Sequence, residues 1–130
     1  MLSRADSGHP QEEVASGKQA NVICRGQIMK PNEVCTETWL SLGCFDTEAE
    51  AIALNKYIST KFVRFLLLQT LSSIMVTDTM FRFVPLQDFT SSSDIDWSQS
   101  VADIDRQLYK KYGLTEEETA FIERTIKPME

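Results

Sequence analysis

The stretch Thr60–Leu71, TKFVRFLLLQTL, constrains the fold most, because its apolar residues cover most of a helical circumference. Such a helix has to be covered by protein on several sides. Lys61 and Arg64 stand three residues apart within it and so share one narrow stripe. That stripe is either the solvated edge of a buried helix, with its cations paired to acids of the same chain, or a surface aimed at an external anion.

Helical spacing already begins upstream of this stretch. Thr47 followed by Glu50 is a capping-box pattern, in which the threonine hydroxyl accepts from the third helical amide. The apolar residues that follow recur every three or four positions, which predicts helix from residue 47 to residue 73. Ser59 and Thr60 compete for backbone hydrogen bonds and can divide it into two consecutive helices.

Three segments have the alternation or composition of strands. Residues 22–29, VICRGQIM, end at the turn signal Lys30-Pro31-Asn32, and residues 34–45 alternate more regularly. The short connection between them favours an antiparallel hairpin. Residues 80–89, MFRFVPLQDF, predict a third strand at a sheet edge, because Pro85 interrupts the run.

The C-terminal part has a different organisation. A linker, SSSD, precedes apolar positions at helical spacing that end at Gly113, a residue suited to a left-handed cap. A second helix begins at Thr115, with Glu118 completing a capping box, and ends by Pro128. We therefore predict an α+β fold, a small mixed or antiparallel sheet packed on a long helix or two consecutive helices. Residues 1–90 are expected to form the α+β domain, and residues 91–130 a helical C-terminal extension packed on it.

Composition excludes several classes of protein. Cys24, Cys35 and Cys44 lack the spacing of a disulfide framework or a zinc site and are expected to be reduced. No apolar run approaches the roughly 18 residues of a membrane span, and the N-terminus lacks the apolar centre of a signal peptide, so a cytoplasmic protein without a membrane partner is expected. The net charge is −6, of which −1 falls in residues 1–82 and −5 in residues 83–130.

Catalytic motifs are missing from the sequence. The only histidine, His9, has no partner at a recognisable spacing, and the acids Glu116, Glu117 and Glu118 fit helix capping. No glycine-rich phosphate loop is present. The residues predict a non-catalytic domain without a metal or cofactor of its own.

We predict that the binding residues are polar and basic side chains in the N-terminal part of the chain. They lie on its loops, on its predicted strands and on the predicted helix of residues 47–73. Such side chains reach base edges or sit on phosphates in DNA-binding proteins. The candidates are Ser3, Arg4, Ser7, Arg25, Lys30, Thr36, Thr38, Lys61 and Arg64.

Several phrases occur together in a distinctive order. They are SRADSGHPQE, the TETW of residues 36–39, FDTEAEA of residues 45–51, YISTKFVRFLL of residues 57–67, FVPLQDF of residues 83–89, and LYKKYGLTEEETAFIE of residues 108–123. This combination resembles the C-terminal, target-recognition region of bacterial restriction-modification enzymes, large adenine-specific DNA methyltransferases of which many are type IIG fusions with an endonuclease. Trp39 stands where tyrosine is commoner in that family.

The resemblance implies that this chain is a piece of such an enzyme, since the methyltransferase's catalytic and cofactor motifs are missing. S-adenosylmethionine would belong to the parent enzyme, and the partners would be double-stranded DNA and the methyltransferase part. The chain is then expected to contribute to target-sequence binding, with the acidic tail packed away from DNA. The alternative is a structural or interaction module that docks onto the methyltransferase and touches no base. Self-association is open to such a piece through exposed apolar surface.

Overall fold

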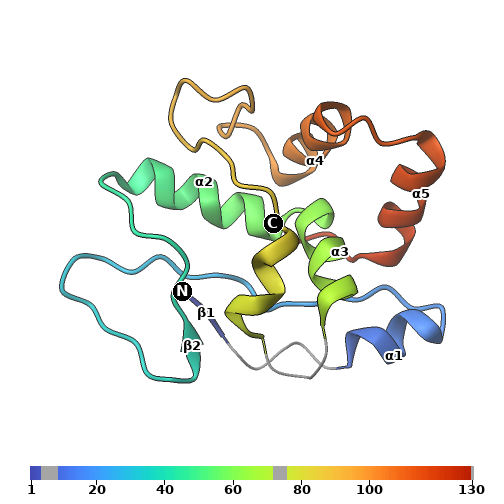
Figure 1. Cartoon of the computed structure of the whole chain (residues 1–130), viewed down its shortest axis with the longest axis horizontal. Helices are drawn as coiled ribbons and strands as arrows, with labels where there is room; N and C mark the ends of the chain where they lie inside the picture. Colours follow the sequence, from blue (N-terminus) through green and yellow to red (C-terminus); the bar gives the residue numbers. More distant parts are fainter. Residues whose placement is uncertain (4–8, 72–75, 130) are drawn as a thin grey trace.

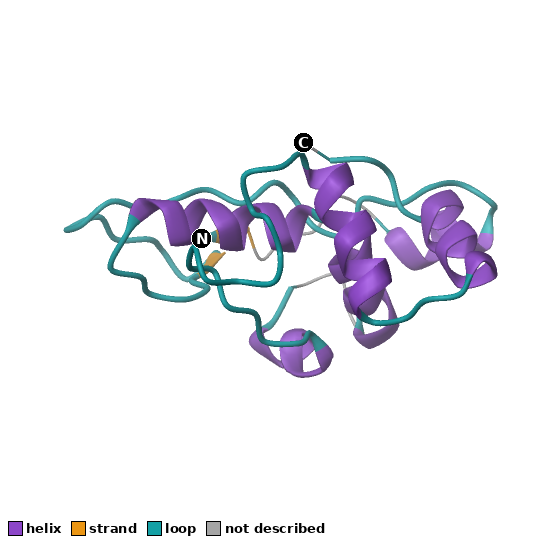
Figure 2. Cartoon of the chain, turned by 90° about the horizontal axis from the view of Figure 1, so that it is seen from above, coloured by secondary structure: helices purple, strands orange, loops and turns teal. Residues whose placement is uncertain are grey.

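The computed structural model describes residues 1–3, 9–71 and 76–129, with the backbone alone at Ser3. The elements in chain order are β1 (Leu2–Ser3), α1 (Pro10–Ala15), β2 (Trp39–Leu40), α2 (Glu48–Ser59), α3 (Lys61–Thr70), the 3-10 helix η1 (Asp78–Phe83), α4 (Val101–Lys111) and α5 (Glu116–Thr125). Helix α3 contacts α2, η1, α4 and α5, and α2 and α5 lie toward opposite ends of the long axis (Figures 1 and 2).

The predicted break in the central helix is confirmed, and Thr60 makes it. This residue is extended, with φ −63° and ψ 150°, and it is fully buried. Its hydroxyl donates to the carbonyl of Tyr57 at 2.6 Å and accepts from the amide of Val63 at 3.3 Å. One side chain therefore closes α2 and caps α3, and the chain changes direction between them.

Both C-terminal helices form where the sequence predicts them. Gly113 has φ +64° after α4, the left-handed conformation expected of a helix-ending glycine. Thr115 and Glu118 form the complete capping box at the start of α5. The extension lies against the central helices, because α4 contacts both α2 and α3 and α5 contacts α3.

The predicted sheet is wrong. Within the described residues, sheet pairing is limited to the two-residue strands β1 and β2, antiparallel with Leu2 opposite Leu40, and an isolated bridge between Ala20 and Ile126. The α+β prediction is therefore replaced by a helix-rich fold, in which the three strand-like segments form no ladder with each other among the described residues.

Local backbone and packing explain why the strands fail. Val22 takes a positive φ of 72°, which breaks the extended run at its start. Gly26 lies so close to α2 that a Cβ there would fall 2.3 Å from the Asn55 side chain, so this segment packs on a helix instead of on a strand. Residues 80–83 belong to η1, which ends at Phe83 with Val84 as its C-cap, just before Pro85.

The core lies between the helices and the extended segment that precedes α2. Its centre is α3, whose Phe62, Val63, Leu67 and Leu68 are all buried. Leu2, Val22, Ile23, Ile104, Leu108, Ile122 and Ile126 come to it from the other elements. The apolar circumference seen in the sequence of α3 is thus covered by the rest of the chain.

The Thr60 hydroxyl should be necessary for the junction of α2 and α3. We expect Thr60→Ala to lower the free energy of unfolding by about 1–2 kcal/mol, the cost of removing a helix cap. Urea denaturation measures it, and Thr119→Ala, which changes a half-buried threonine inside α5, is the control. Equal effects of the two substitutions would contradict the role assigned to Thr60.

Candidate functional site

The predicted binding residues separate into two groups in the structure. Arg25, Lys30, Thr36 and Thr38 are exposed and lie on the long connection between α1 and α2. The hydroxyls of Thr36 and Thr38 lie 2.7 Å apart in a hydrogen bond to each other. Lys61 and Arg64 lie in α3, where other parts of the chain cover them. Ser3 is placed by its backbone in β1, while Arg4 and Ser7 fall outside the described residues.

Arg64 is completely buried, and backbone carbonyls surround its guanidinium. Nε donates to Ser59 O at 3.0 Å and to Thr60 O at 3.3 Å, Nη1 to Asn21 O at 3.2 Å, and Nη2 to Lys127 O at 2.6 Å. Burial lowers the pKa of Arg64 to about 10, opposed by Asp105 and Tyr109 nearby. The side chain stays protonated at neutral pH and, in this fold, presents no surface to a phosphate.

Lys61 is turned toward the C-terminal helix. Its Nζ forms an ion pair with the carboxylate of Glu123 and also donates to the Glu123 carbonyl at 3.3 Å. Tyr109 donates its hydroxyl to the other carboxylate oxygen at 3.0 Å, and burial raises the pKa of that hydroxyl. The sequence left open whether Lys61 pairs with an acid of the same chain or faces an external anion. The structure shows the first, a pair with an acid of the C-terminal part.

Asp105 completes this arrangement, and the sequence search for binding residues did not include it. Its two carboxylate oxygens accept from the amides of Lys61 and Phe62, each at 2.9 Å, so a residue of α4 caps α3. Burial raises the pKa of Asp105 to about 6, although both amide bonds and Arg64 act in the opposite direction. A signal was present, because Asp105 stands four residues after Val101 and four before Tyr109, within the apolar stripe of α4.

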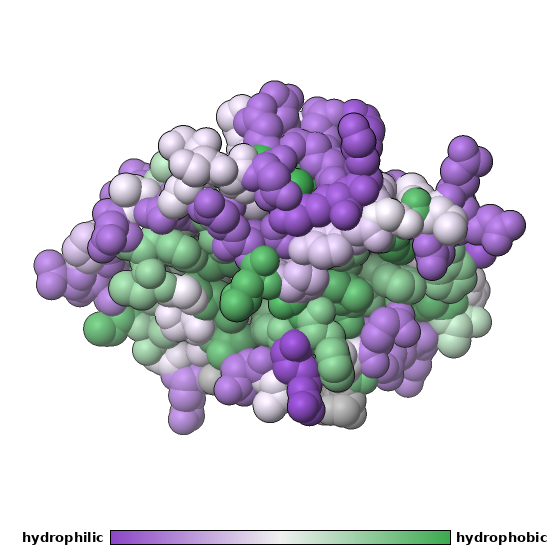
Figure 3. All heavy atoms as spheres, turned by 45° about the horizontal axis from the view of Figure 1, so that its top comes forward, coloured by the Kyte–Doolittle hydropathy of each residue, from purple (hydrophilic) through white to green (hydrophobic). Residues whose placement is uncertain are grey.

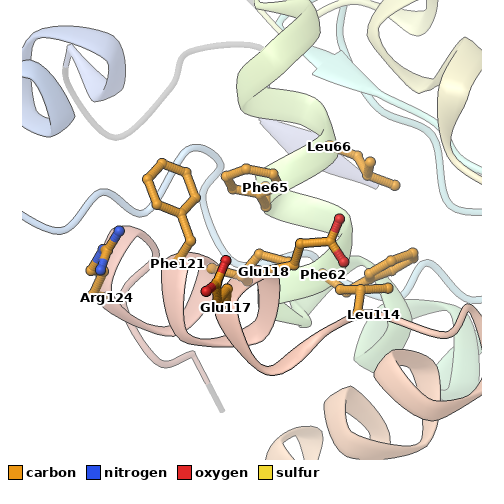
Figure 4. A pocket seen from close by; sticks show the side chains of 9 residues that line it. Phe62, Phe65, Leu66, Leu114, Glu117, Glu118, Phe121 and Arg124 are labelled. Carbon is orange, nitrogen blue, oxygen red and sulfur yellow. The ribbon is translucent and has the colours of Figure 1, made fainter.

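Two surface hollows are lined by residues that the structure describes. The first, of about 480 Å³, lies between α3 and α5, where Phe65 and Phe121 meet edge to face at 5.7 Å and Phe62 lies beside Leu114 (Figure 4). The second, of about 670 Å³, lies between residues 27–33 and 41–48 with α2 as its floor.

Family models, curated proteins and solved structures give no significant match to this chain. The function must therefore be argued from the residues and their geometry. In the part of the chain that the structure describes, His, Cys, Asp and Glu side chains form no group of three or more that could hold a metal ion. None of the described helices combines the length and apolar character needed to cross a bilayer.

The burial of Arg64 predicts a large effect on stability. We expect Arg64→Met to lower the free energy of unfolding by about 3–5 kcal/mol, because carbonyls from three parts of the chain lose a charged donor. Arg64→Lys should recover little of this loss, since an ammonium cannot reproduce the planar fork of donors. Urea denaturation is the measurement, with Arg124→Met on the exposed face of α5 as the matched control; similar losses at both positions would contradict the assignment.

Asp105 predicts a pH dependence with a definite sign. Its pKa is about 6 in the folded chain and near 3.8 in the unfolded chain, so the folded state binds the proton more tightly. Its contribution is fully present below about pH 4 and is lost as the pH rises through about 6, a change of up to about 3 kcal/mol. Asp105→Asn should remove this component. The free energy of unfolding of both proteins is measured from about pH 4 to pH 7. A difference between them that stays constant with pH would contradict the role assigned to Asp105.

Proposed function

We propose that this chain is a non-catalytic docking module of a restriction-modification DNA methyltransferase, which joins the methyltransferase part to its recognition region and contacts few phosphates itself. The observation that carries the proposal is the use of the α3 cations inside the fold. Arg64 binds backbone carbonyls and Lys61 binds Glu123, so the stripe expected to meet DNA is already occupied.

Charge supports the same function. A module that binds DNA alone is expected to be basic, whereas this chain has a net charge of −6, most of it in the C-terminal part. With Lys61 and Arg64 engaged, the exposed cations of the predicted set that the structure describes are Arg25 and Lys30, and Glu33 and Glu37 lie on the same connection. Long-range attraction to phosphate is therefore weak.

Exposed apolar side chains supply a docking surface. Leu86 is 99% exposed and Phe83 is 65% exposed, both in the segment from η1 to α4, and Val34 is 93% exposed on the long connection. Figure 3 shows apolar side chains gathered in a broad area beneath a polar edge. Apolar side chains that gather over a broad area mark surfaces that another protein covers, whereas singly exposed ones are ordinary. The resemblance of the sequence supplies the identity of that partner.

A second candidate function is direct contribution to target-sequence binding through the long connection. The observation that favours it is the position of this connection, whose residues 25–45 project at the end of the molecule opposite α5 (Figure 1). The acidic helix is thus kept away from a duplex that approaches Arg25, Lys30, Thr36 and Thr38.

The two functions are separated by one pair of titrations. For docking, we expect the separately expressed methyltransferase part to bind this chain, and Phe83→Ser with Leu86→Ser to weaken binding about tenfold or more. Ile52→Ser, at a partly exposed apolar position on α2, is the control. Isothermal calorimetry measures both.

In the companion titration, the chain is added to a fluorescent duplex carrying the parent enzyme's target, at salt from about 20 to 200 mM. Docking predicts no measurable affinity at physiological salt. Salt-dependent binding that Arg25→Ala and Lys30→Ala abolish, together with failure of the first titration, would replace docking by direct recognition.

A further inference from the structure

The hollow of about 480 Å³ between α3 and α5 leaves apolar side chains of both helices only partly covered. Phe65 and Leu66 of α3 line it and are half-buried. On the α5 side, Phe121 is 43% exposed, although its ring already meets that of Phe65 (Figure 4). A groove of this kind, between two helices and with apolar walls, is a surface on which a further helix packs.

One stripe of α5 and the residues just before it borders the hollow. It consists of Leu114, Glu117, Phe121 and Arg124, which all line the hollow. Their spacings of three, four and three residues place them on a single face of the helix. Apolar and charged residues alternate along this stripe, with the acid near its beginning and the base at its end.

The stripe is complementary to a second copy of itself. Glu117 and Arg124 lie equally far, in opposite directions, from the midpoint between Ala120 and Phe121. When two α5 helices pair antiparallel about this midpoint, Glu117 of each copy lies opposite Arg124 of the other, and the two Phe121 rings meet at the centre. A two-fold interface requires such reciprocity, in which the same patch serves both copies. Antiparallel pairing also brings opposite ends of the two helix dipoles together.

Both charges are available for this pairing. Glu117 and Arg124 are exposed, and the ion pairs found among the described residues join other side chains. The guanidinium of Arg124 lies 4.9 Å from the centre of the Phe121 ring, which holds the cation at the edge of the hollow. Its donors can therefore reach a carboxylate of the second copy without leaving the ring.

We propose that α5 is a dimerisation helix, through which two copies of this chain associate about a two-fold axis beside Phe121. Ion pairs between Glu117 and Arg124 of different copies fix the antiparallel register. The two hollows then join into one core between α3 and α5 of both copies, a four-helix arrangement. This association needs neither DNA nor a methyltransferase and does not involve Phe83 or Leu86, so its failure would leave the docking proposal in place.

The expected dimer is weak. Two ten-residue helices with the flanking side chains of α3 form a small interface, so we expect a dissociation constant on the order of 10 μM. The net charge of −6 on each copy opposes association, but salt at about 0.15 M screens charges separated by more than about 8 Å. The paired charges at the interface are closer than this and keep their effect.

Charge reversal tests the proposed register. Sedimentation velocity is measured from about 1 to 500 μM protein at about 0.15 M salt. We expect Glu117→Arg and Arg124→Glu each to weaken dimerisation about tenfold or more, because each places like charges opposite one another at both ends of the interface. An equal mixture of the two variants should dimerise like the original chain, because both pairs across the interface are then again of opposite charge.

Glu116→Arg is the matched control. It makes the same change of charge in the same first turn of α5, at an exposed position outside the hollow, and should dimerise like the original chain. Three results would each overturn the proposal. They are an original chain that stays monomeric over the whole concentration range, equal weakening by Glu116→Arg and Glu117→Arg, and a mixture that associates no better than its separate components.

Discussion

The buried guanidinium of Arg64 organises this fold. It binds carbonyls from the end of α2, from the segment near Asn21 and from the segment near Lys127, which are distant in the sequence. A buried cation that bonds only uncharged acceptors needs each of them in place, since hydrogen bonds to charged groups contribute about 1.5–3 kcal/mol and a missing partner leaves a desolvation cost. The positions of three chain segments are therefore coupled through one side chain.

The charges around α3 form a connected set. Asp105 holds the start of α3, Lys61 binds Glu123, and Tyr109 donates to the same carboxylate, so α3, α4 and α5 are joined by polar contacts as well as by apolar packing. These charges largely satisfy one another within the fold. The net charge of −6, of which −5 falls in residues 83–130, gives the molecule a negative outer field despite its thirteen lysines and arginines.

The features of the fold that could be predicted from the sequence are those that depend on residues adjacent in the sequence. The break at Thr60, the capping box of Thr115 and the left-handed Gly113 each depend on a few adjacent positions. The sheet was mispredicted because alternation in residues 22–29 and 34–45 does not specify a partner, and the packing of Gly26 on Asn55 depends on residues far along the chain. Helical spacing correctly places Arg64 on the same stripe as Lys61. The residues next to Arg64 in the sequence do not indicate which distant segments cover that stripe. The exposed candidates Arg25, Lys30, Thr36 and Thr38 remain predictions.

The bridge between Ala20 and Ile126 determines when this molecule can fold. Ala20 donates to Thr125 O and accepts from the amide of Lys127, so a segment near the beginning of the chain is completed by one near its end, next to the carbonyl that Arg64 needs. Contacts of such sequence separation form late, because loop-closure entropy opposes them. During synthesis, the apolar circumference of α3 emerges long before the residues that close over it. The apolar surface of α3 therefore stays uncovered until translation has passed Ile126, and transiently exposed apolar surface of this kind favours aggregation.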